Sequence, residues 1–99
     1  MFRHVVLFTW SADATDEQKA AVPRRLAELP GIIPQIRSYV LGPDAGVSTD
    51  TCDFAVVADF DSAEDFLAYR DHPAHQAVIA ESIKPILAGR AAVQYTVDA

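Results

Sequence analysis

The stretch FRHVVLFTW at residues 2–10 is the strongest indication of the fold of this 99-residue chain. It is rich in β-branched and aromatic residues, which is typical of a β-strand. Successive side chains of a strand point to opposite faces, so even-numbered residues share one face and odd-numbered residues the other. The even set is Phe2, His4, Val6, Phe8 and Trp10, and the odd set is Arg3, Val5, Leu7 and Thr9. Both sets are mostly apolar, which predicts a strand that is covered on both sides.

A helix is predicted directly after this strand. Thr15 and Gln18 have the spacing of a capping box, in which each side chain satisfies a backbone N–H group of the other residue. Pro23 lies inside the helix and should kink it, and the pair Pro30-Gly31 should end it. Three apolar residues recur at helical spacing and predict the buried side, namely Val22, Leu26 and Leu29.

Three more strands are predicted, at residues 36–41, 53–60 and 91–97. The first of these should be closed by the pair Gly42-Pro43. The polar segment at residues 44–51 indicates a surface loop.

A second helical region is predicted between the last two strands. Ser62 is a suitable N-cap for it, but the helix must pause before Pro73, because the residue that precedes a proline avoids the α conformation. Pro73 can begin a second segment that runs to about Ala88. We expect Pro85 to bend or end that segment and Gly89 to serve as its C-cap.

The predicted order β-α-β-β-α-β is that of ferredoxin-like folds. We therefore expect one α+β domain over residues 1–99, with a four-stranded antiparallel sheet and helices on one face. The other face carries apolar side chains such as Val5, Leu7 and Val57, which would form an unusually large exposed patch on a monomer. A second copy can cover this patch, so we expect a homodimer in which two sheets pack together as an α+β barrel.

Composition argues against several partners. The net charge of −6 disfavours nucleic-acid binding, which needs clustered Lys and Arg, and no apolar run approaches the ~20 residues of a membrane span. Residues 2–10 do not indicate a signal peptide, because Arg3 and His4 interrupt the apolar run. The single cysteine, Cys52, excludes an internal disulfide and fits a reducing cytoplasm.

The three histidines are the first candidates for acid–base chemistry, because imidazole titrates near neutral pH. The apolar even face should lower the pKa of His4. His72 and His75 flank the expected break at Pro73. A structural interpretation stays open, in which His72 caps the second helical segment and His75 is a buried residue with one hydrogen bond. No group of residues has the spacing of a zinc site, so we expect no metal and no other cofactor.

Four segments of the chain occur together in an order typical of one protein family. They are RHVVLF at residues 3–8, LPGI at 29–32, IRS at 36–38 and YRDHPAHQ at 69–76. The last is the strongest match, and the set resembles the stress-responsive A/B barrel (Dabb) family over nearly the whole chain. The resemblance implies a dimeric α+β barrel with a pocket between sheet and helices.

The resemblance also implies candidate site residues. One plant member of the family is an aldol-type polyketide cyclase that uses a histidine and a tyrosine, and the matching positions here are His75 and Tyr69. An aspartate orients the histidine of that cyclase, and the matching position here is Gln94, whose amide cannot stabilise an imidazolium as a carboxylate does. The expected ligand-binding residues are His4, Val6, Phe8, Leu26, Val56, His72 and Gln94.

Two classes of function stay open. The first is an enzyme that acts on a small apolar or aromatic carbonyl compound by proton transfer without a cofactor, with His75 as base and Tyr69 as donor. The second is a non-catalytic dimeric barrel that binds a small molecule or has a role in stress, which the replacement of the orienting carboxylate by Gln94 favours. A monooxygenase of similar barrel fold is a third alternative, to which the sole tryptophan, Trp10, lends little support.

Overall fold

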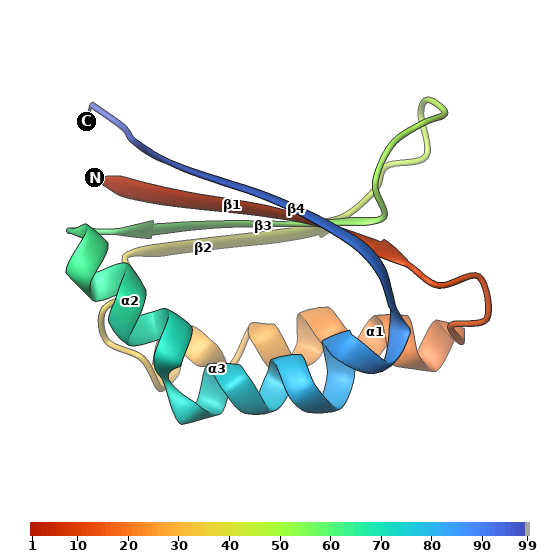
Figure 1. Ribbon diagram of the computed structural model, residues 1–99, viewed down its shortest axis with the longest axis horizontal. Coiled ribbons are helices and arrows are strands. Elements are labelled where there is room, and N and C mark those ends of the chain that lie inside the picture. The colour runs from red at the N-terminus through yellow and green to blue at the C-terminus, as the bar shows by residue number, and fades with distance from the viewer. Residues whose placement is uncertain (99) are drawn as a thin grey trace.

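The computed structural model describes residues 1–98 and contains one sheet with a layer of helices on one of its faces (Figure 1). The strands are β1 (Phe2–Trp10), β2 (Ser38–Pro43), β3 (Phe54–Phe60) and β4 (Leu87–Thr96). The helices are α1 (Asp16–Leu26), α2 (Ala63–Asp71) and α3 (Pro73–Val78). Short turns of other helix types follow at Leu29–Gly31 (3-10), Ile79–Ile83 (π) and Lys84–Ile86 (3-10).

The sheet has four strands in the order β2-β3-β1-β4, and every neighbouring pair is antiparallel. This arrangement confirms the predicted ferredoxin-like fold. β1 is central, and its residue His4 lies opposite Ala58 of β3 and Gln94 of β4. The ends of β1 and β4 lie side by side, where the Met1 amino group donates to the Val97 carbonyl at 3.1 Å.

The predicted alternation of β1 is confirmed on the side that faces the helices. Its even-numbered residues from His4 to Trp10 are buried against side chains of the helical layer such as Leu26 and Phe66. The face that the odd-numbered residues of β1 share carries no helix (Figure 1). On that face, Val40 of β2 and Val93 of β4 are 60% and 55% exposed. One face of the sheet therefore forms the core, and the other is an apolar surface that the chain itself leaves open.

Local signals correctly predict the start of the first helix. The Thr15 N–H group donates to Gln18 Oε1 at 2.9 Å, and the Gln18 N–H group donates to Thr15 Oγ1 at 3.1 Å, which is the predicted capping box. Pro23 lies inside α1, as expected. The regular helix ends at Leu26, and Leu29 belongs to the short turn that follows.

Three predicted boundaries are wrong. The helical path ends at Ile86, and β4 begins at Leu87, so Gly89 is no C-cap but a strand residue opposite Thr9 of β1. Pro85 explains the early end, because a proline has no N–H group to donate and its ring clashes with the carbonyl four residues earlier in an α-helix. The chain passes this point through the π and 3-10 turns. At the opposite edge of the sheet, β2 includes the pair Gly42-Pro43, which an edge strand tolerates.

Two structural findings concern membranes and metals. None of the helices formed by residues 1–98 has the length and apolar character needed to cross a bilayer. The same part of the chain brings together no group of three or more His, Cys, Asp or Glu side chains that could hold a metal ion.

Candidate functional site

A cavity of about 330 Å³ lies between the sheet and the helical layer. Its wall is mostly apolar, with polar side chains contributed by β1, β2, β4, α2, α3 and the 3-10 turn at Lys84–Ile86. Every predicted site residue except His72 lines it, namely His4, Val6, Phe8, Leu26, Val56, Tyr69, His75 and Gln94. Whether these residues bind a ligand stays a prediction.

His72 lies at the break between α2 and α3 and has a structural role there. Its Nδ1 atom accepts a hydrogen bond from the Ala74 N–H group at 3.0 Å, which caps the first turn of α3. This is the capping alternative that the sequence left open. His72 does not line the cavity.

Two tyrosines and a histidine form a cluster in the cavity wall. The hydroxyl oxygens of Tyr39 and Tyr69 lie 2.7 Å apart, and the ring of Tyr69 lies over that of His75 with centroids separated by 4.1 Å. Burial raises the pKa of Tyr69 to about 12 and raises the pKa of Tyr39 strongly as well. Both phenols are therefore protonated at neutral pH. One hydroxyl donates to the other, and the second proton is available to a ligand.

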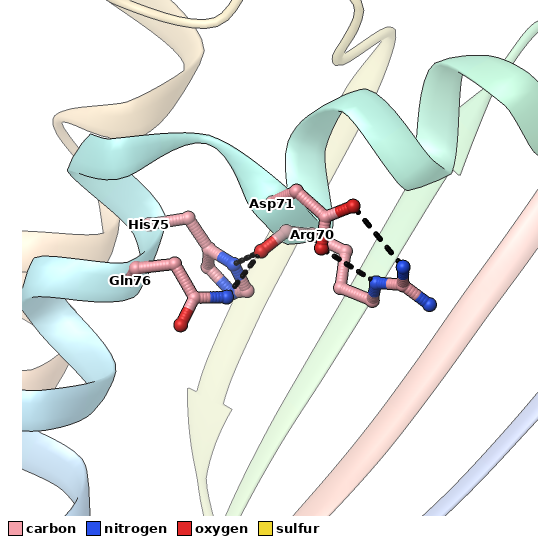
Figure 2. Close-up of polar contacts among 4 residues, drawn as sticks. All are labelled: Arg70, Asp71, His75 and Gln76. Carbon is pink, nitrogen blue, oxygen red and sulfur yellow. Dashed lines mark hydrogen bonds and ion pairs between the residues drawn. The ribbon is translucent and has the colours of Figure 1, made fainter.

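The backbone at the α2–α3 break holds the ring of His75. Its Nδ1 atom lies 3.0 Å from the Arg70 carbonyl oxygen, and Figure 2 shows that the Gln76 side chain donates to the same oxygen, at 2.6 Å. A carbonyl oxygen can only accept, so the imidazole proton must lie on Nδ1. The neutral ring then keeps an unprotonated Nε2. Burial lowers the pKa of His75, which favours this neutral form.

Gln94 does not orient His75. Its amide nitrogen lies 2.9 Å from His4 Nδ1, because Gln94 of β4 lies directly opposite His4 of β1 in the sheet. The position that the resemblance matches to the orienting aspartate therefore contacts His4 in this chain, and the Arg70 carbonyl holds His75. An amide nitrogen can only donate, so neutral His4 carries its proton on Nε2.

His4 is a buried imidazole that gives the fold a dependence on pH. Burial, then the charges of Arg90 and His75, lower its pKa from 6.5 to about 4. The folded state therefore binds this proton less readily than the unfolded state, and the stability contribution is fully present above about pH 6.5 and lost as the pH falls towards 4. His75 titrates in the same direction.

We expect the free energy of unfolding of the wild type to fall by ~2–3 kcal/mol between pH 7.5 and 4.5, because each unit of pKa shift corresponds to ~1.4 kcal/mol. His4→Gln replaces the imidazole with a group that does not titrate, so its stability should change much less over this range. Urea denaturation of both proteins at the two pH values measures the difference. Parallel curves for the two proteins would show that His4 is not the titrating group.

Several residues of the cavity wall were not predicted from the sequence. Tyr39 could have been found from strand alternation, because it shares a face with the inward-facing Leu41. Arg70, Lys84 and Arg90 also line the cavity. For the last two there was no local signal, because their positions depend on where the helical path ends and β4 begins.

Comparison with solved structures supports the fold. A dimeric ferredoxin-like protein of unknown function from Thermobifida fusca YX is 44% identical, with a TM-score of 0.90 over 97% of this chain and 90% of the other. A dimeric ferredoxin-like protein of unknown function from Bacteroides fragilis is 29% identical, with a TM-score of 0.82 over 97% and 95% of the two chains. The hydroxynitrile lyase from Passiflora edulis is 21% identical, with a TM-score of 0.84 over 98% and 93%.

Comparison with curated proteins gives no match. The family model described as the stress responsive A/B barrel domain matches residues 2–97, which is nearly the whole chain. This match agrees with the order of strands and helices and with the fold of the similar structures. The chain belongs to the stress responsive A/B barrel domain family.

Proposed function

We propose that the cavity binds a small apolar or aromatic carbonyl compound. His75 then accepts a proton from the carbon next to the carbonyl group of this compound. The observation that carries this proposal is the state of the His75 ring. Its Nδ1–H group is fixed on a backbone carbonyl, and the Nε2 lone pair is left without a partner among the described residues. Such an anchored, neutral imidazole in a mostly apolar cavity has the properties of a general base.

The tyrosine pair supplies the complementary group. Removal of a proton from the carbon next to a carbonyl places negative charge on the carbonyl oxygen. A phenol that stays protonated can donate a hydrogen bond to this oxygen, and such a bond is stronger beside the apolar side chains of a cavity wall than in bulk water. Tyr69 is the nearer donor because its ring lies over that of His75, and Tyr39 holds the Tyr69 hydroxyl in place. The resulting carbanion could attack a second carbonyl, as in an aldol-type cyclase.

A non-catalytic binding protein is the second candidate, and one observation favours it. The group that accepts the hydrogen bond from His75 Nδ1 is the backbone carbonyl of Arg70. Its partial negative charge stabilises a protonated imidazole less than the full charge of a carboxylate would. The hydroxynitrile lyase from Passiflora edulis is 21% identical to this chain. A likeness at this level supports a shared fold and carries no argument about the reaction.

Solvent deuterium exchange tests the enzyme proposal. A panel of small aryl ketones is incubated with the protein in heavy water at neutral pH, and loss of the hydrogens next to the carbonyl is followed by proton NMR. We expect exchange above the buffer rate, together with shifts in the resonances of cavity residues. Binding without exchange would favour the non-catalytic candidate, and neither binding nor exchange for any ketone would contradict both.

We also infer that the working form is a homodimer joined through the open face of the sheet. This face carries Val5, Leu7, Val57, Val93 and Tyr95, the last of which is 46% exposed. On the same face, Asp59 is buried and accepts two hydrogen bonds from Arg3, at 2.7 and 2.9 Å, so its charge is already paired. The two similar proteins from T. fusca and B. fragilis are described as dimeric. A cytoplasmic location, suggested by the lone Cys52, stays part of this proposal.

A further inference from the structure

The charged side chains that line the cavity are all cationic. They are Arg70, Lys84 and Arg90, and no Asp or Glu lines it. The chain as a whole has the opposite balance, with 14 acidic and 8 basic residues. A random sample of its charged residues would therefore be mainly acidic, so the lining of the cavity has a charge composition opposite in sign to the net charge of the chain.

Two of these cations have no counter-ion within the described part of the chain. Arg70 is paired with the neighbouring Asp71, through contacts of 2.8 and 3.1 Å that Figure 2 shows. The four ion pairs formed among residues 1–98 include neither Lys84 nor Arg90, and no side-chain hydrogen bond involves either of them. Lys84 and Arg90, here called the cationic pair, are therefore available to an anion that enters the cavity.

The strand register places polar, apolar and cationic groups in succession along the floor of the cavity. One row across the sheet carries Tyr39, His4 and Gln94, because Ala58 lies opposite both Tyr39 and His4. Two residues further along β1, the next inward-facing row carries Val6, Val56 and Ala92. Two residues beyond that, Phe8 lies opposite Arg90. The first and last rows are four residues apart, or ~13 Å between Cα atoms.

We propose that the ligand of this cavity carries a carboxylate, which binds the cationic pair, on a short apolar or aromatic body that extends to the Tyr39–Tyr69–His75 cluster. The order of groups on the ligand then matches the order of rows on the floor. An Arg guanidinium binds a carboxylate through two parallel N–H groups, and the ammonium of Lys84 adds a second positive charge to the same cavity wall. A phosphate is a poorer candidate, because the chain has no glycine-rich loop of the kind that surrounds phosphate groups with backbone N–H donors. This inference rests on the proposed function, since it assumes that the cavity binds a small molecule.

The electrostatics of the cavity agree with this arrangement. The positive charge of Arg90 contributes to lowering the pKa of both His4 and His75, so it acts on the space in which the ligand would lie. A bound carboxylate would offset this charge. Binding should therefore raise the pKa of the two histidines, and proton NMR can follow this change independently of any catalysis.

A matched pair of probes tests the carboxylate directly. 3-Benzoylpropionate contains an aryl ketone and a carboxylate, and 3-benzoylpropionamide differs from it only in the neutral amide group. Both are titrated into the full-length protein at pH 7.5 and low salt, with the dissociation constants measured by calorimetry or NMR. We expect the acid to bind at least tenfold more tightly than the amide, and this preference to shrink as salt is added.

Charge-removing variants locate the preference. Lys84→Gln and Arg90→Gln should each reduce the affinity for the acid about tenfold and leave that for the amide nearly unchanged. The matched controls are Lys19→Gln and Arg24→Gln, which remove the same charges from positions on α1 that do not line the cavity and should leave both affinities unchanged.

Each outcome bears on one proposal. Equal affinities for acid and amide, or equal losses in the cavity and control variants, would overturn the carboxylate site and leave the proposed function standing. Selective binding of the acid without deuterium exchange would support the carboxylate site and contradict the proton-transfer step. Binding of neither probe would overturn the carboxylate site.

Discussion

Replacing His75 with glutamine is expected to reduce the rate of deuterium exchange on a bound aryl ketone by ~10²–10⁴-fold, the usual contribution of a general base. Glutamine keeps an N–H donor that can reach the Arg70 carbonyl, so the α2–α3 break should retain much of its structure. It has no basic nitrogen, so the proton acceptor is lost. The wild-type rate should also fall as the pH drops below 6.5, through the lowered pKa of His75.

His72→Gln is the matched control, because it makes the same change three residues away, at a side chain that caps α3 and does not line the cavity. It should cost ~1 kcal/mol of stability and leave the exchange rate near that of the wild type. If His75→Gln instead melts well below the wild type, exchanges at the wild-type rate and binds ketones equally well, His75 is a structural residue and the enzyme proposal fails.

Tyr69→Phe should reduce the exchange rate less than His75→Gln does. The change removes one hydrogen bond to the developing oxyanion, and loss of such a donor costs up to ~10²–10³-fold in the most favourable sites. Tyr39→Phe should have a smaller effect, because it leaves the Tyr69 hydroxyl in the cavity and removes only its partner. Exchange rates measured side by side under saturating ketone give the order. A larger effect for Tyr39→Phe would show that Tyr39, not Tyr69, donates to the ligand.

The second large effect is expected at the open face of the sheet. Leu7 lies between Ala55 of β3 and Ala91 of β4, near the middle of this face. Leu7→Asp would bury an unpaired carboxylate in a dimer interface, at a cost of several kcal/mol. Light scattering at micromolar concentration should then give a mass near the 10.8 kDa of one chain, whereas the wild type should give about twice that mass.

Leu67→Asp is the control for this experiment. It introduces the same charge at an apolar residue that is 42% exposed on α2, in the helical layer on the opposite side of the sheet. It should leave the dimer intact. A wild-type mass near that of one chain would contradict the proposed dimer, and a stable dimer of Leu7→Asp would place the interface elsewhere.

Short-range patterns in the sequence were sufficient for the fold. The alternation of β1, the Thr15 capping box and the break at Pro73 each depend on residues only a few positions apart, and each is present in the structure. The contact between Tyr69 and His75 also depends on residues close in sequence, because the two are six residues apart across that break. Such features follow from local stereochemistry and the period of apolar residues, and the packing of distant segments does not change them.

The tertiary structure alone decided how the polar groups of the cavity pair. Tyr39 meets Tyr69 across 30 residues, and His4 meets Gln94 across 90 residues, through strand register and the docking of α2 on the sheet. The sequence could not predict which backbone oxygen holds His75, because every residue has a backbone carbonyl and only the folded chain determines which one His75 contacts. The cationic pair depends on where the helical path ends beyond Pro85, and therefore on which residues β4 contributes to its pairing with β1. One residue more or less in that turn would move Arg90 to the opposite face of the sheet, because side chains alternate along a strand.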